Sequence, residues 1–119
     1  MRKMDKRRMI RVNDEIANEL NKILREGIKD PRLDGVMASV LRAETTADLK
    51  FCKVFVSIMG DDEGKAKGMA AIESAKGHIR SQIASAINLR QTPEFTFILD
   101  DSLEHGFKIG AILDEVNKG

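Results

Sequence analysis

A glycine inside a helical pattern constrains this chain most, in the stretch Ser74-Ala75-Lys76-Gly77-His78-Ile79-Arg80. Apolar residues recur at helical spacing on both sides of it, at Met69 and Ile72 and again at Ile79 and Ile83. Glycine within a helix costs about 1 kcal/mol relative to alanine, and it lets the backbone bend. The stretch therefore predicts two helices that meet at a kink formed by Ala75 and Gly77. Close packing of the backbone at Gly77 is the simpler alternative.

Hydrophobic periodicity predicts the other elements around this kink. A first helix over residues 6–26 is followed by a hairpin of strands 36–45 and 50–59, with a turn at 46–49. Helices over 65–75 and 77–90 precede a strand over 94–99, and Asp100 or Asp101 caps a last helix with an apolar stripe. That stripe consists of Ile109, Ile112, Leu113 and Val116. The order α-β-β-α-α-β-α predicts an α+β domain, with helices on one face of a three-stranded sheet.

The strand over residues 50–59 separates two kinds of side chain. Cys52, Val54, Val56 and Ile58 alternate with Phe51, Lys53, Phe55 and Ser57. The first set is predicted to face the core, with Cys52 as a small buried hydrophobe. For Phe51 and Phe55, packing against the first or last helix is favoured over stacking on nucleic-acid bases.

Composition excludes several classes of protein. A chain of 119 residues is expected to form one domain, and its single cysteine allows neither an internal disulfide nor a multi-cysteine metal site. No apolar run approaches the ~20 residues of a membrane span, so a cytoplasmic protein is expected. No nucleotide-binding motif or catalytic triad spacing is present, and neither cofactor nor metal nor enzymatic activity is predicted.

Charge is distributed unevenly although the net charge is only +1. Residues 1–11 hold six cationic side chains and one acid, whereas residues 91–119 hold two cations and six acids. A basic head of this kind engages phosphates, and residues 1–5 are expected to be its flexible extension. A merely solvated terminus is the alternative.

Four motifs in order resemble the bacterial ribosome-binding factor A family, which has a type II KH fold. They are residues 25–33 (REGIKDPRL), 51–57 (FCKVFVS), 74–80 (SAKGHIR) and 89–97 (LRQTPEFTF), followed by Asp100-Asp101-Ser102. The resemblance covers residues from about 7 to 116. It implies a monomeric factor that binds the immature small ribosomal subunit through its rRNA and supports rRNA processing during ribosome biogenesis. Other assembly factors are further partners that it implies.

One departure from ordinary KH domains affects the mode of binding. The GxxG loop that clamps single-stranded nucleic acid is absent, and Ala75-Lys76-Gly77 stands in its place, as in this family. Binding is therefore expected to depend on the shape of folded rRNA and on phosphate contacts. A protein-interaction module that docks through its open sheet face, and a general single-strand RNA-binding KH domain, are the alternative functions.

Cationic side chains are the candidate RNA contacts, and we expect them to converge on one surface. The main candidates are Arg7, Arg8, Arg11, Lys29, Arg32, Lys76, Arg80 and Arg90. Secondary candidates are Lys3, Lys6, Lys53 and His78, although a surface or capping role is favoured for His78. Asp30 is expected to make a local cap, because Pro31 forces it away from helical geometry.

Overall fold

Three strands form one sheet in the order β1-β2-β3 in the computed structural model, which describes residues 6–26, 28, 30–33 and 36–102. Strand β1 (Met37–Thr45) is antiparallel to β2 (Phe51–Met59), and β2 is parallel to β3 (Glu94–Leu99). The predicted strand bounds are confirmed to within one residue. Because parallel neighbours need a crossover, the chain leaves β2 through helices α2 (Asp62–Ser74) and α3 (Lys76–Ala86) before it returns as β3.

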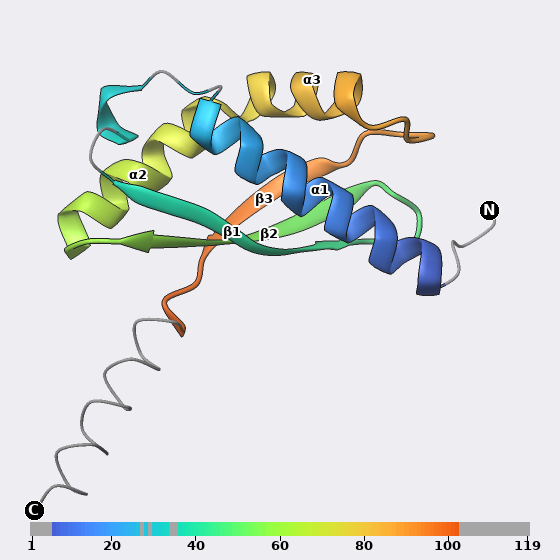
Figure 1. Ribbon diagram of the computed structural model, residues 1–119, viewed down its shortest axis with the longest axis horizontal. Coiled ribbons are helices and arrows are strands. Elements are labelled where there is room, and N and C mark those ends of the chain that lie inside the picture. The colour runs from blue at the N-terminus through green and yellow to red at the C-terminus, as the bar shows by residue number, and fades with distance from the viewer. Residues whose placement is uncertain (1–5, 27, 29, 34–35, 103–119) are drawn as a thin grey trace, which may run out of the picture.

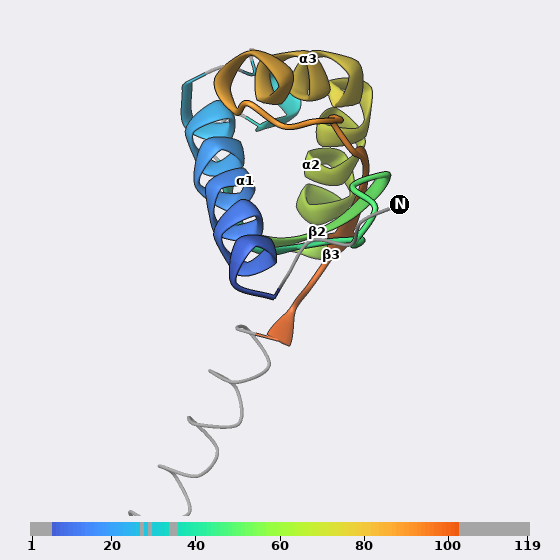
Figure 2. The ribbon, with the colours of Figure 1, turned by 90° about the vertical axis from the view of Figure 1, so that its right-hand side faces the viewer.

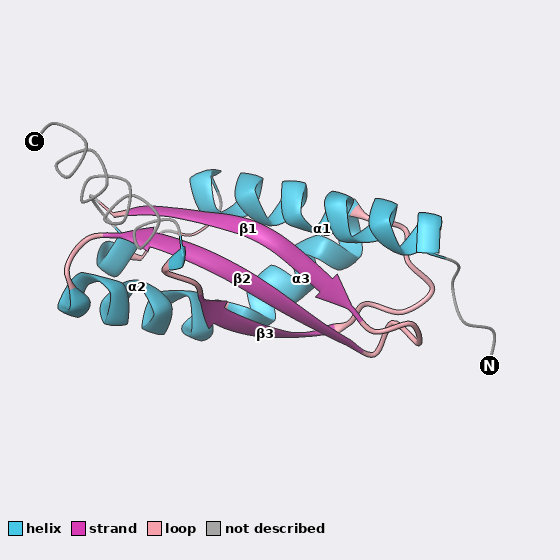
Figure 3. Ribbon diagram, turned by 90° about the horizontal axis from the view of Figure 1, so that it is seen from below, coloured by secondary structure: helices cyan, strands magenta, loops and turns pink. Residues whose placement is uncertain are grey.

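The helices cover one face of this sheet, as predicted (Figures 1 and 2). Helix α1 (Lys6–Glu26) has the predicted bounds, and its apolar stripe is buried against the sheet. The core-facing side of β2 is also as predicted: Cys52, Val54, Val56 and Ile58 are all at most 2% exposed. The other face of the sheet carries no helix among the described residues (Figure 3). The first six elements thus have the predicted order, and the predicted last helix and residues 1–5 lie outside the described residues.

Two asparagines of α1 bind the outer edge of β1. The Val40 N–H donates to Asn21 Oδ1 (2.7 Å), and Asn21 Nδ2 donates to the Val40 carbonyl (3.1 Å). The Thr45 N–H donates to Asn13 Oδ1 (3.0 Å). The register of β1 shifts between Val40 and Arg42, which explains why its sequence showed no clean alternation. Side chains of α1 therefore satisfy backbone groups that an edge strand would otherwise expose.

The break between α2 and α3 lies at Ala75, two positions before Gly77, the residue at which the sequence predicts the bend. Ala75 has φ −89° and ψ 3°, and its N–H is shared among the carbonyls of residues 71–73. Gly77 lies within α3, and a Cβ added there would meet nothing within 4 Å. The kink is thus confirmed, but neither a bend at Gly77 nor close packing against it is present. Gly77 has no steric requirement for glycine.

The helix bounds around the kink also differ from the prediction. Helix α2 begins three residues early, because Asp61 caps it by accepting the Gly64 N–H (2.7 Å) and two acids occupy its first turn. Helix α3 ends at Ala86, because Ile87 is extended and buried, so the predicted end at residue 90 is wrong. Arg90 consequently lies in the loop before β3.

We expect Gly77→Ala to stabilise the protein by about 0.5–1 kcal/mol, because alanine restricts the unfolded chain and fits without contact. Thermal melting of the variant checks this. Gly68→Ala is the matched comparison, since its Cβ would lie 3.0 Å from Ile58 Cδ1 and part of the gain would be lost to that contact. A lower melting temperature for Gly77→Ala would show that the kink needs glycine.

Candidate nucleic-acid interface

Exposed cations gather at the end of the molecule where the β1–β2 hairpin turns. Arg7, Arg8 and Arg11 are exposed on the first turns of α1, as is Lys6. The hydrogen bond from the Thr45 N–H to Asn13 fixes these turns beside the hairpin. The Glu94 N–H donates to the Lys50 carbonyl (2.9 Å), so the loop that carries Arg90 reaches the same end (Figure 1). We call this group the hairpin-end cluster; its members are Lys6, Arg7, Arg8, Arg11 and Arg90.

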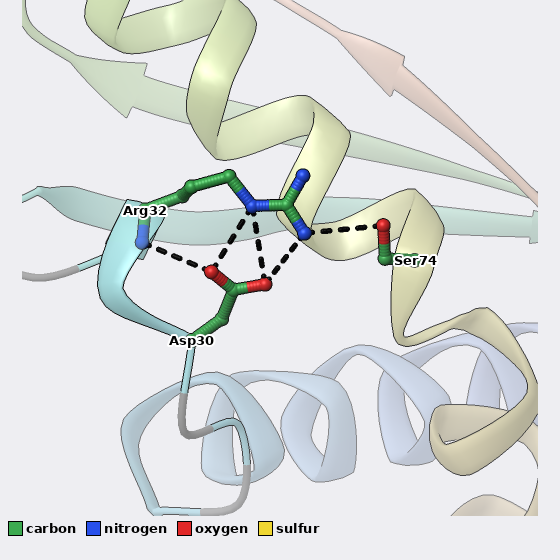
Figure 4. A network of polar contacts seen from close by, with 3 residues as sticks. All are labelled: Asp30, Arg32 and Ser74. Carbon is green, nitrogen blue, oxygen red and sulfur yellow. Dashed lines mark hydrogen bonds and ion pairs between the residues drawn. The ribbon is translucent and has the colours of Figure 1, made fainter.

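A second group lies at the α2–α3 junction. Arg32, in the 3₁₀ turn η1 (Pro31–Leu33), donates from Nη2 to Asp30 Oδ2 (2.6 Å) and to Ser74 Oγ (3.1 Å) (Figure 4). Its Nε donates to both carboxylate oxygens of Asp30, and its N–H donates to Oδ1. Asp30 therefore makes the predicted local cap, and Arg32 clamps η1 to the end of α2.

Hydrogen bonds from the Arg32 side chain lower the pKa of Asp30, and the same bonds raise the pKa of Arg32. Asp30 is thus ionised at neutral pH, and its charge balances that of Arg32. A phosphate that approached this guanidinium would compete with a bidentate carboxylate. Arg32 consequently has a partner within the protein, Asp30, which the sequence did not reveal.

Most other candidates near the junction also have partners within the protein. Lys76 Nζ lies 3.1 Å from Glu73 Oε2. Arg80 donates from Nη2 to the Thr92 carbonyl (2.9 Å) and from Nε to that of Pro93 (3.3 Å), so it holds the loop before β3. His78 is an exposed residue of α3 whose Nε2 lies 3.2 Å from Gln82 Nε2.

The candidate cations therefore form two groups rather than the single surface expected from the sequence. Figures 1 and 2 show the start of α1 and the α2–α3 junction at different corners of the molecule. The 21 residues of α1 alone span about 30 Å. The structure brings Arg32 and Lys76 to the junction and leaves Arg7, Arg8 and Arg11 at the hairpin end. Lys29 and Lys3 lie outside the described residues.

On the open sheet face, Arg42 covers Phe55. Its guanidinium carbon lies 3.8 Å from the centre of the Phe55 ring, in a cation–π contact. The same side chain pairs with Glu44 (3.3 Å) and Asp100 (3.4 Å). Phe51 is 54% exposed, and both phenylalanines lie on the face of the sheet opposite α1, so their predicted packing against the first helix is wrong. The last helix, the other predicted packing partner, lies outside the described residues. Lys53 is exposed between the two phenylalanines, opposite Glu44 on β1.

The described residues contain no group of three or more histidine, cysteine or acidic side chains that could hold a metal ion. Burial raises the pKa of the Cys52 thiol, which leaves it protonated and unreactive at neutral pH. No helix in the described ranges has the length and apolar character that crossing a membrane requires.

The family model for ribosome-binding factor A matches residues 8–113. The chain belongs to this family. It is 45% identical over 118 residues to ribosome-binding factor A of Caldanaerobacter subterraneus, with coverage of 99% of this chain and 95% of the relative. It is 44% identical over 108 residues to that of Lachnospira eligens, with coverage of 91% and 82%.

Solved structures of ribosome-binding factor A have the same fold. The Thermus thermophilus crystal structure matches with a TM-score of 0.65 at 19% identity, over 76% of this chain and 93% of that one. A homology model of the Thermus thermophilus factor, fitted into a cryo-EM map of its complex with the 30S subunit, matches with a TM-score of 0.63 at 18% identity. That match covers 78% of this chain and 96% of the other.

Proposed function

We propose that this protein is an assembly factor that binds the immature small ribosomal subunit through its rRNA and supports subunit maturation and rRNA processing. Membership of the ribosome-binding factor A family supports this function, as does the fold shared with a factor that has been fitted into a 30S complex. It acts in the bacterial cytoplasm as a monomer, with other assembly factors among its partners. It catalyses no reaction.

The hairpin-end cluster supplies the main contact with rRNA in this proposal. Three of its arginines, Arg7, Arg8 and Arg11, are exposed together on the first turns of α1. Phosphate groups are the natural ligands of such a cluster, since arginine binds them through charge and a planar set of donors. Lys6 belongs to this cluster, and Lys29, Lys3, Lys53 and His78 are further proposed contacts with rRNA.

A protein that catalyses no reaction can still influence assembly if it binds two rRNA arrangements with different affinities. A factor that binds one rRNA arrangement more tightly than another shifts the population toward the first, by no more than the difference in affinity. Bound to the immature subunit, the protein holds rRNA in a conformation that precedes the mature one.

We expect the triple variant Arg7→Gln, Arg8→Gln, Arg11→Gln to bind small subunits roughly 10- to 100-fold more weakly near 0.15 M salt. Each lost phosphate contact removes one favourable counterion-release contribution. Co-sedimentation with purified small subunits measures the affinity. Because the three side chains are exposed at a helix start, the melting temperature should change little.

Lys67→Gln is the control for this experiment. Lys67 is exposed on α2 and pairs with Glu63 (3.1 Å), and it is not part of the hairpin-end cluster. Its neutralisation should leave subunit binding within twofold. Equal affinity of the triple variant and the wild type would contradict the proposed interface.

A further inference from the structure

The two edges of the sheet differ in how their backbone groups are satisfied. On β1, the outer backbone groups of Val40 and Thr45 are bound by asparagines of α1. On β3, the Glu94 N–H donates to Lys50 and the Asp100 N–H donates to Val56, so even-numbered residues face β2. The N–H groups of Phe95, Phe97 and Leu99 therefore face away from the sheet. No side chain or backbone of the described residues accepts from these three groups.

An edge of this kind accepts a further strand. Six residues of β3 form the free edge, which Figure 3 shows at the side of the sheet opposite β1. Its last residue, Leu99, is 37% exposed, and Ile98 is half-buried. An added extended segment would form backbone hydrogen bonds and place alternate side chains on the open face beside Thr96 and Ile98.

The acidic residues along the β3 edge indicate which charge an added strand would carry. Residues 94–101 contain Glu94, Asp100 and Asp101 and no cation. Of these three acids, Asp100 alone has an ion pair with a described cation, Arg42, which also pairs with Glu44. Hydrogen bonds from Ser102 and Arg42 lower the pKa of the Asp100 carboxyl. An RNA strand would meet uncompensated carboxylates along this edge, whereas lysine or arginine side chains would be attracted to them.

We propose that the free edge of β3 binds an extended, basic segment of a protein of the small ribosomal subunit by strand addition. This inference rests on the proposed function and gives the protein two contacts, one of the hairpin-end cluster with rRNA and one of the β3 edge with protein. The contact at the β3 edge fixes where the bound factor lies on the subunit, because the basic segment belongs to one subunit protein.

A photo-cross-linker at Thr96 identifies what binds the β3 edge, because this side chain is exposed on β3. Full-length protein with Thr96→p-benzoylphenylalanine is bound to purified small subunits and irradiated, and mass spectrometry identifies the cross-linked partner. A lysine- and arginine-rich peptide of a subunit protein is expected. Cross-links to rRNA alone, or none from a variant that still co-sediments, would overturn this inference and leave the proposed function standing. Loss of co-sedimentation by the wild type would overturn both.

A matched pair at Leu99 tests the strand hydrogen bonds. Leu99→Pro removes one outward N–H and leaves the ladder to β2 intact, whereas Leu99→Ala keeps that N–H and shortens the side chain. Introduced into the cross-linking protein, Leu99→Pro should lower the cross-link yield at least tenfold, and Leu99→Ala should change it less than twofold. Equal yields would refute strand addition. Should Leu99→Pro melt early, Glu94→Lys replaces it as a test of the charge attraction, with a fivefold loss of yield expected and a smaller loss for Glu94→Gln, which only removes the negative charge.

Discussion

Asn21→Leu should destabilise the protein by about 2–4 kcal/mol, although leucine favours helix formation more than asparagine does. The substitution removes two hydrogen bonds at once and leaves the Val40 N–H and carbonyl without their partner. Each partly buried backbone group that loses its partner costs about 1–3 kcal/mol. The loss falls at the register shift of β1, where β2 offers no alternative acceptor or donor to these two groups. Thermal or urea unfolding gives the change in free energy.

Asn18→Leu is the matched control for this prediction. Asn18 is exposed on the same helix, so the identical substitution should change the free energy of unfolding by less than about 0.5 kcal/mol. The difference between the variants then reports the bonds to Val40 rather than helix propensity or an added leucine. Equal melting of both variants would show that the bonds between α1 and β1 contribute no net stability.

Periodic burial explains which parts of the fold could be predicted from the sequence. The apolar stripe of α1 and the alternation of β2 are each a repeat along one element, and both match the buried residues except at Ser57, which is buried although it alternates with the core-facing set. The bonds of Asn21 leave no such pattern, because a single polar residue on a helix is compatible with solvent, a cap or another element. Only the packing of α1 along the edge of β1 decides among these.

The site was less predictable than the fold for a similar reason. A lysine or arginine in the sequence shows that a positive charge is present, but not whether an acidic group of the folded protein already pairs with it. Arg32 pairs with Asp30, two residues away, and reaches Ser74 across 42 positions of the chain. Arg42 lies over Phe55 because the bulge in β1 sets their register. These contacts depend on tertiary structure, and so does the separation of the cations into two groups.

Salt should weaken binding to small subunits roughly 100- to 500-fold between 50 and 200 mM KCl, at fixed Mg²⁺. This follows if about five phosphates are neutralised, because each contributes a log–log slope of about −0.7 to −0.9. Binding through the acidic β3 edge alone would give a much smaller slope. Affinities from co-sedimentation at four or more salt concentrations give the slope directly.

The triple variant Arg7→Gln, Arg8→Gln, Arg11→Gln links that slope to particular side chains. If each arginine contacts one phosphate, the slope should become shallower by about 2–3. A loss of affinity through altered folding would instead lower binding equally at every salt concentration and leave the slope unchanged. Arg80→Gln provides a comparison, since its guanidinium bonds to the Thr92 and Pro93 carbonyls and its loss should lower stability with little effect on the slope. A wild-type slope near zero would exclude phosphate contacts as the main source of affinity.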